Sequence, residues 1–224
     1  MTTHRWSAAC FDLDGTLTDP KPGITACIRH ALQRLGRTPP PADDLTWCIG
    51  PPLLASFETL LGDRELAPRA LALYRERFGA VGLFENRVYD GIPATLAACR
   101  QAGLRLFVAT SKPTVYATRI AAHFSFDRHF EAVCGSELDG TRTDKSALLA
   151  WVLARHGLDP ARTVMIGDRH HDMVGARNNG MAGLGVAYGY GSRAELADAG
   201  AFRIVTDPAA IPDALADAQA DDPL

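Results

Sequence analysis

The chain of 224 residues contains no apolar run of the ~18 residues that a membrane-spanning helix takes. Its first residues, MTTHRWSAACFDLDG, turn acidic too early to resemble a signal peptide. Lys and Arg form no cluster, and the formal net charge is −3, so we expect no binding face for a nucleic acid polymer or a membrane. These absences favour a cytoplasmic protein.

Cysteine is also sparse. The five cysteines are odd in number, widely spaced and contain no C-x-x-C pair. In a chain of this length, that pattern favours free, mostly buried thiols in a reducing compartment. The composition, 47% hydrophobic and 22% charged, is that of a globular protein with room for one domain of ~150 residues and an insert.

Apolar residues recur at helical spacing in the first third of the chain. The three predicted helices cover 24–35, 51–62 and 66–78, with a turn over 39–45. Gly36 and Gly62 end the first two helices. Residues 20–82 are therefore expected to be all helical and to form an insert with its own small core.

From Tyr89 onward, short apolar segments alternate with helical ones. Together with a first strand over 8–14, the predicted strands cover 104–111, 130–136, 163–168, 182–189 and 202–206. The predicted helices cover 92–102, 113–124, 145–157, 171–180 and 193–200, before a short terminal helix and a frayed tail over 217–224. This alternation predicts a parallel sheet with helices on both faces.

Polar residues stand where three of the predicted strands end. They are Asp12 and Asp14 after the first strand, Thr110, Ser111 and Lys112 after the second, and Asp168 and Asp172 after the fourth. Sheets of this kind bind ligands beyond the carboxyl ends of their strands. We therefore expect these residues to share one crevice.

The four aspartates form two close pairs. Asp12 and Asp14 project from the same face if the strand continues through them, and Asp168 and Asp172 share one side of a helix start. Taken singly, each pair is also explained by capping of a loop or of a helix N-terminus. Four converging carboxylates repel one another unless a cation lies between them, and Mg²⁺ suits such oxygen ligands best.

Lys145 opens a predicted helix, and its spacing places it on the inner, apolar stripe of that helix. A lysine in a first turn can extend to solvent along its own stem. Beside four carboxylates, we favour an inward Lys145 that pairs with a carboxylate or with an incoming anion.

Such a site can transfer a phosphoryl group. The Asp12 carboxylate can attack phosphorus and form an aspartyl phosphate, and Mg²⁺ with Lys145 would compensate the charge. Asp14 can protonate the leaving alkoxide and then act as base for the water that hydrolyses the intermediate.

Together, FDLDGTLTD, VATSKP, Lys145 and MIGDRHHD resemble the four motifs of the haloacid dehalogenase superfamily of phosphatases, in the right order and over nearly the whole chain. The resemblance implies an α/β fold, with a Rossmann-like three-layer core and parallel sheet over 1–17 and 86–224. It also implies an inserted all-helical cap over 18–85 that opens and closes as a hinge. The segments YDGIP, GSELDG, IGPPL and GVAYGYGS are similar to the phosphoglycolate phosphatase-like and 5′-nucleotidase-like branch.

The resemblance also assigns roles. Asp12 would be nucleophile and metal ligand, and Asp14 acid and base, with its backbone carbonyl on the metal. Asp168 would ligate Mg²⁺, and Asp172 would support the ion directly or through water. Thr110, Ser111 and Lys145 would hold the phosphate, although Ser111 stands where many relatives carry asparagine. We expect Lys112 at the surface, and IGPPL at the position of the loop that sets substrate specificity.

The expected function is hydrolysis of a small phosphorylated metabolite by a monomer or small homo-oligomer. A phosphomutase keeps the same catalytic residues and stays open, as does a phospho-acceptor module that does not turn over. A dehalogenase would lack Asp14, and a phosphonate hydrolase would need a cap lysine other than Lys21 at the cap entrance.

Two further patterns are weaker. The segment GYGSRA fits a dinucleotide-binding fingerprint, but it follows the fifth strand and only ~30 residues remain, so we interpret it as a glycine-rich turn and expect no organic cofactor. His170 and His171 have no third histidine or cysteine at ligand spacing, which favours surface or supporting roles.

Overall fold

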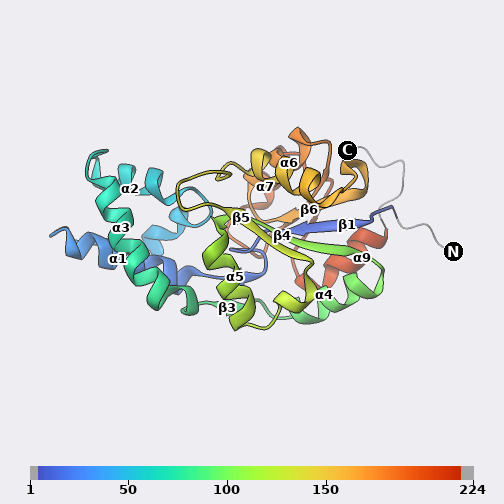
Figure 1. The fold of residues 1–224 in the computed structure, drawn as a ribbon, viewed down its shortest axis with the longest axis horizontal. Coiled ribbons are helices and arrows are strands. Elements are labelled where there is room, and N and C mark those ends of the chain that lie inside the picture. The colour runs from blue at the N-terminus through green and yellow to red at the C-terminus, as the bar shows by residue number, and fades with distance from the viewer. Residues whose placement is uncertain (1–4, 218–224) are drawn as a thin grey trace. The chain divides into compact units, whose positions relative to one another are not determined.

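The computed structural model describes residues 5–217, so most of the predicted frayed tail lies outside the described residues. The chain divides into two compact units, one made of Met1–Leu17 with Val88–Leu224 and the other of Thr18–Arg87. Each unit is described by itself below (Figure 1).

The larger unit contains a six-stranded sheet in the order β5-β4-β1-β6-β7-β8. The strands are β1 (Ala8–Phe11), β4 (Arg105–Pro113), β5 (Ala132–Ser136), β6 (Thr163–Gly167), β7 (Ala182–Val186) and β8 (Arg203–Val205). All five neighbouring pairs are parallel. The predicted α/β fold with a parallel sheet is confirmed.

Helices cover both faces of this sheet (Figure 1). They are α4 (Ile92–Gln101), α5 (Thr114–His123), α6 (Lys145–His156), α7 (His170–Asn178), α8 (Arg193–Asp198) and α9 (Ile211–Ala216). Short 3₁₀ turns lie at Asp127–His129, Pro160–Arg162 and Pro208–Ala210. Under α6 and α7 lies a core that includes Cys10, Phe107, Leu149, Met165 and Ala176, all with no exposed surface. Because both faces are covered, the central strands are continuously apolar instead of alternating.

Strand β1 ends at Phe11, three residues earlier than predicted. The amide of Asp12 still donates to the Ile166 carbonyl at 2.9 Å, but the chain then turns, and Leu17 N donates to Leu13 O. Gly15 has a φ of +86°, a conformation that L side chains rarely adopt. Asp12 and Asp14 therefore lie beyond the end of β1, and the condition under which they would share one face of a continuing strand is not met.

The smaller unit is mainly helical. It contains α1 (Lys21–Arg34), α2 (Leu53–Leu61) and α3 (Ala67–Ala80), with 3₁₀ turns at Asp43–Cys48 and Gly82–Phe84. The first 3₁₀ turn begins inside the turn predicted over 39–45. Two short paired strands, β2 (Thr18–Asp19) and β3 (Arg87–Val88), lie where the chain enters and leaves this helical segment.

Three aromatic rings are part of the core of the smaller unit, together with buried aliphatic residues such as Ile28 and Leu45. Tyr74 stacks on Phe78 with ring centroids 5.2 Å apart, and Phe57 meets Tyr74 edge to face. Beside them, Arg77 donates to both carboxylate oxygens of Glu85, at 2.7 and 2.9 Å. Gly62 ends α2 in the left-handed conformation, as its position in the sequence predicts.

All five cysteines are buried and free, in agreement with the sequence. Among the described residues, no helix combines the length and hydropathy needed to cross a membrane.

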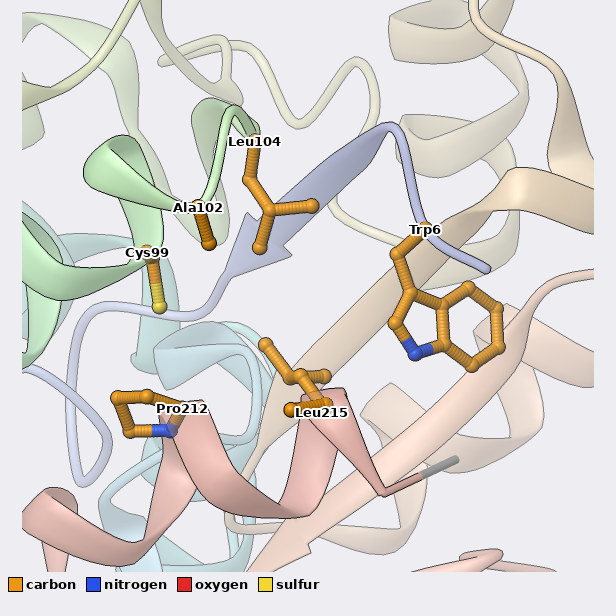
Figure 2. A pocket seen from close by; sticks show the side chains of 7 residues that line it. Trp6, Cys99, Ala102, Leu104, Pro212 and Leu215 are labelled. Atoms are coloured by element: carbon orange, nitrogen blue, oxygen red, sulfur yellow. The ribbon is translucent and has the colours of Figure 1, made fainter. Parts of the chain in front are cut away.

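A small apolar pocket lies at the amino end of the sheet, next to the chain segment that precedes β1 (Figure 2). Its lining consists of Trp6, Cys99, Ala102, Leu104, Pro212, Leu215 and Ala216. The cavity volume is about 40 Å³, whereas pockets for small molecules are usually ~300 Å³ or more. A phosphorylated metabolite therefore does not fit there, and the polar residues lie at the opposite, carboxyl end of the strands.

Candidate active site

Three aspartates meet at the carboxyl edge of the sheet. Asp12 follows β1, Asp168 follows β6, and Asp172 lies in the first turn of α7. Since β1 and β6 are neighbours, their ends bring the side chains together. One carboxylate oxygen from each lies within 4.8 Å of the others, and all three residues are buried. Asp14, the fourth predicted metal ligand, is not in this cluster.

Lys145 points into the cluster. Its Nζ lies 2.7 Å from Asp172 Oδ1 and 3.1 Å from Asp12 Oδ1, and it donates to the Ala109 carbonyl at 2.9 Å. Only 4% of the side chain is exposed, so the inward placement predicted from the helical stripe is correct. Burial alone would lower the Lys145 pKa, but Asp12 and Asp172 raise it above its usual value, which keeps the ammonium charged.

A glycine makes room for this lysine. A Cβ atom placed on Gly175 of α7 would lie 2.8 Å from Lys145 Cγ. The absence of a side chain at Gly175 therefore lets the lysine stem pass α7.

Asp168 is fully buried and held from two sides. Its Oδ2 accepts from the Tyr190 amide at 2.8 Å, and its Oδ1 accepts from Thr16 Oγ1 at 3.3 Å. Burial, followed by the charges of Asp172 and Asp12, raises the Asp168 pKa well above its usual value. The second contribution, from Asp172 and Asp12, reflects an excess of negative charge, because three carboxylates lie near one ammonium.

The negative charge of the three carboxylates indicates whether a metal ion would suit this site. Burial raises the Asp172 pKa to about 6, against the opposing effect of Lys145. A divalent cation with oxygen ligands would relieve the same repulsion without protonation. Asp172 also accepts from the Arg169 amide at 3.2 Å, so it caps α7 as well. The donor set therefore suits a divalent cation, and the capping interpretation is also correct for Asp172.

A glycine-rich loop after β7 packs directly on Asp168. A Cβ atom on Gly191 would lie 1.9 Å from the Asp168 carbonyl oxygen, and one on Gly189 would lie 2.5 Å from Asp168 Cβ. The Tyr188 hydroxyl also donates to the Thr16 carbonyl at 2.8 Å. The GYGS glycines thus allow the loop to support the acidic cluster, a role that sequence reasoning missed.

Asp14 has a separate partner. Its Oδ2 lies 2.5 Å from Lys112 Nζ, with 12% and 6% of the two side chains exposed. The prediction that Lys112 is a surface residue is wrong because β4 continues to Pro113, with an irregular register between Thr110 and Pro113. Burial raises the pKa of Asp14, and Lys112 partly offsets this effect.

The other predicted residues have local contacts. Thr110 is buried, and its Oγ1 accepts from the Lys112 amide at 3.2 Å. The Ser111 carbonyl accepts from Ser136 Oγ at 2.8 Å. His170 Nδ1 lies 2.8 Å from Glu195 Oε1, and the ring of exposed His171 is tilted by 41° against that of His170, with ring centroids 3.8 Å apart. The candidate metal cluster found among the described residues consists of Asp12, Asp168 and Asp172 and includes neither histidine.

Fold and site together define an α/β enzyme with an acidic centre at the carboxyl edge of a parallel sheet. The family model "Haloacid dehalogenase-like hydrolase" matches residues 9–186, and the chain belongs to this family. The predicted family is therefore confirmed.

Three proteins with similar sequences or structures were compared with this chain. A "5′-nucleotidase" of Pseudomonas aeruginosa is 53% identical over 86% of this chain and 87% of its own length. "Tyrosine-protein kinase PtkA" of Mycobacterium tuberculosis is 44% identical over 90% of this chain and 68% of its own. The crystal structure of a "predicted phosphatase" from Clostridium acetobutylicum has a TM-score of 0.90 and 39% identity, covering 94% of this chain and 98% of that one. The predicted enzyme class, phosphoric monoester hydrolase, is confirmed by the family match, the 5′-nucleotidase relative and the phosphatase structure.

Proposed function

We propose that the protein is a Mg²⁺-dependent phosphatase that hydrolyses a small phosphomonoester through an aspartyl phosphate on Asp12. The observation that carries the proposal is the position of Lys145, whose Nζ lies between the carboxylates of Asp12 and Asp172. A buried cation beside a carboxylate nucleophile is what attack on an anionic phosphate needs.

The carboxylates of Asp12, Asp168 and Asp172 would hold Mg²⁺, with the backbone carbonyl of Asp14 as a further ligand. When bound, the ion would neutralise charge on the phosphoryl group and its oxygen ligands. The excess of carboxylates over ammonium groups supports this assignment.

The chain's own residues divide the reaction into two steps. In the first step, a carboxylate oxygen of Asp12 forms a bond to phosphorus while the bond from phosphorus to the leaving oxygen breaks. Asp14 gives a proton to that oxygen. In the second step, Asp14 takes a proton from water, and the hydroxide displaces Asp12 from phosphorus. Thr110 and Ser111 would orient the phosphoryl oxygens, and Lys145 would hold Asp12 in place.

We further propose that residues 18–85 form the cap and that IGPPL, at 49–53, contributes to substrate selection. The relative named 5′-nucleotidase makes 5′-mononucleotides the first substrates to test, followed by phosphoglycolate. The relative named a tyrosine kinase adds a protein tyrosine as a possible phosphoryl acceptor. A phosphomutase and a phospho-acceptor module remain the alternatives. We place the protein in the cytoplasm as a monomer or small homo-oligomer.

The test is phosphate release from 5′-mononucleotides, phosphoglycolate, pyrophosphate and sugar phosphates, with Mg²⁺ and with a chelator. The matched control is Asp12→Asn, which keeps the side-chain shape and removes the nucleophile. Mg²⁺-dependent release by the native chain and none by the variant would support the proposal. Release that survives in the variant would exclude Asp12 as the nucleophile. Stable phosphorylation without release, or transfer to a second sugar or to tyrosine, would favour an alternative.

A further inference from the structure

We infer that Lys112 is a positioning residue, which holds the Asp14 carboxyl by one oxygen and leaves the other to exchange the proton with the leaving group and with water. This inference rests on the proposed function, because it assigns Lys112 a part in the acid and base role proposed for Asp14. Its effect on the reaction would pass through Asp14, without contact between Lys112 and the reacting atoms.

The contact between the two side chains is short and sheltered. Lys112 Nζ lies 2.5 Å from Asp14 Oδ2, and the two side chains are 6% and 12% exposed. Desolvation of a buried ion pair is costly, and loss of one partner leaves an uncompensated buried charge, so the two groups are held together. The pair is therefore able to fix the direction of the Asp14 carboxyl.

The second oxygen of Asp14 is in a different situation. Oδ1 is buried and makes no hydrogen bond among the described residues. Buried polar atoms are generally hydrogen-bonded, and exceptions are often found where a ligand or a reacting group completes the contacts. The ion pair with Lys112 therefore uses Oδ2, and Oδ1 is the Asp14 oxygen without a hydrogen bond among the described residues.

The local backbone explains why Asp14 needs such a partner. β1 ends at Phe11, and Asp14 forms only an isolated bridge after it, so no continuous strand runs through Asp14. Gly15, with φ of +86°, then turns the chain away. Lys145 contacts Asp12, Asp172 and the Ala109 carbonyl instead. Lys112, at the irregular end of β4, supplies the cation that Asp14 contacts.

The role predicts a dependence on the leaving group. An alkyl phosphate loses a strongly basic alkoxide and needs the proton from Asp14, whereas p-nitrophenyl phosphate loses a stable phenolate and does not. General acid catalysis contributes ~10²–10⁴-fold, so Lys112→Met should lower kcat/KM on an alkyl phosphate by ~100-fold or more. The loss on p-nitrophenyl phosphate should be less than ~10-fold, because that leaving group needs little general acid catalysis. Lys112→Arg, which keeps the charge, should recover most of the alkyl phosphate activity.

A double-variant comparison separates positioning from a merely structural role. If Lys112 acts through Asp14, adding Lys112→Met to Asp14→Asn should cost nothing further in kcat/KM on p-nitrophenyl phosphate. The double variant removes both charges together, so it avoids the unpaired carboxylate that could unfold Lys112→Met alone. Arg105→Met, which breaks an ion pair with Glu131 at the other end of the same strand, is the matched control and should leave both rates unchanged.

Equal losses on the two substrates, or a further loss in the double variant, would overturn the inference while leaving the phosphatase proposal intact. No hydrolysis of either ester by the native chain with Mg²⁺ would overturn the proposed function and the inference with it. The rate of a variant is compared with that of the native chain only if the melting temperatures of the two proteins agree within a few degrees.

Discussion

Lys145 and Asp172 form a buried ion pair, with Nζ 2.7 Å from Oδ1 and almost no solvent exposure of either side chain. They come from the first turns of α6 and α7, two helices that pack side by side. The pair joins the helix that carries the cation to the helix that carries the acidic residue. Its removal should therefore affect stability as well as catalysis.

We expect Lys145→Met to lower the free energy of unfolding by ~3 kcal/mol, because it leaves buried carboxylates without their cation. Turnover should fall by ~10²-fold or more, since charge compensation for the attacking Asp12 is lost. Urea unfolding and phosphate release measure the two effects. Arg105→Met, which removes a half-exposed cation, should cost ~1 kcal/mol or less. Native-like turnover in Lys145→Met would contradict the proposed role.

Mg²⁺ should stabilise the folded chain. The three buried carboxylates repel one another, and an ion that binds only the folded state stabilises it by ~2.7 kcal/mol at a hundred times its dissociation constant. A rise of the melting temperature with Mg²⁺, reversed by chelator, is the expected observation. Asp168→Asn should abolish most of that rise while it relieves repulsion in the metal-free chain. Equal Mg²⁺-induced rises in melting temperature in the native chain and in Asp168→Asn would mean that the ion binds at a site that does not include Asp168.

Gly191→Ala should damage the metal site although residue 191 carries no functional group. The added Cβ would lie 1.9 Å from the Asp168 carbonyl oxygen, so the loop or the Asp168 backbone must shift. We expect a weaker Mg²⁺-induced rise in melting temperature and lower turnover. Gly103→Ala is the control, because a Cβ there meets no atom within 4 Å and costs only the strain of its positive φ. Equal Mg²⁺-induced rises in melting temperature and equal turnover in the two variants would show that the close contact between Gly191 and Asp168 does not matter for the metal site.

Much of the fold follows from the sequence. The alternation of apolar strands with helices predicts a parallel sheet, and the motif residues Asp12, Lys145, Asp168 and Asp172 do converge. These predictions succeed because the ends of neighbouring parallel strands lie at one edge of the sheet, whatever the details of the loops.

What the sequence did not predict depends on local backbone geometry. The early end of β1 and the irregular register of β4 decide that Asp14 meets Lys112, and neither leaves a periodic pattern. The packing of Gly191 on Asp168 joins segments more than 20 residues apart, and glycine spacing alone indicated only a turn. Gly189 and Gly191 follow β7, which pairs with β6, the strand that precedes Asp168. Two glycines at the end of a strand next to such a strand are the sequence signal that would have indicated this contact.

Glu195 should give the protein an acid-sensitive contact at the start of α7. The Glu195 carboxylate lies 2.9 Å from Arg169 Nε and from the His170 amide, and 2.8 Å from His170 Nδ1. Burial alone would raise the pKa of Glu195, but these contacts hold it at about 2. A carboxyl whose folded pKa lies below its unfolded value of ~4.3 stabilises the fold above that value, and the contribution is lost as pH falls toward 2.

We therefore expect Glu195→Gln to lower the free energy of unfolding at pH 7, with a difference from the native chain that shrinks between about pH 4.5 and pH 3. The difference is the quantity to measure, by urea unfolding, because the raised pKa values of Asp168 and Asp172 give the total stability the opposite slope with pH. Glu131→Gln is the matched control, since the Glu131 pKa is also lowered, by Arg105, but its side chain is 40% exposed and its effect should be smaller. A difference for Glu195→Gln that stays constant down to pH 3 would mean that the lost stability comes from packing, because the charge on Glu195 would then contribute nothing.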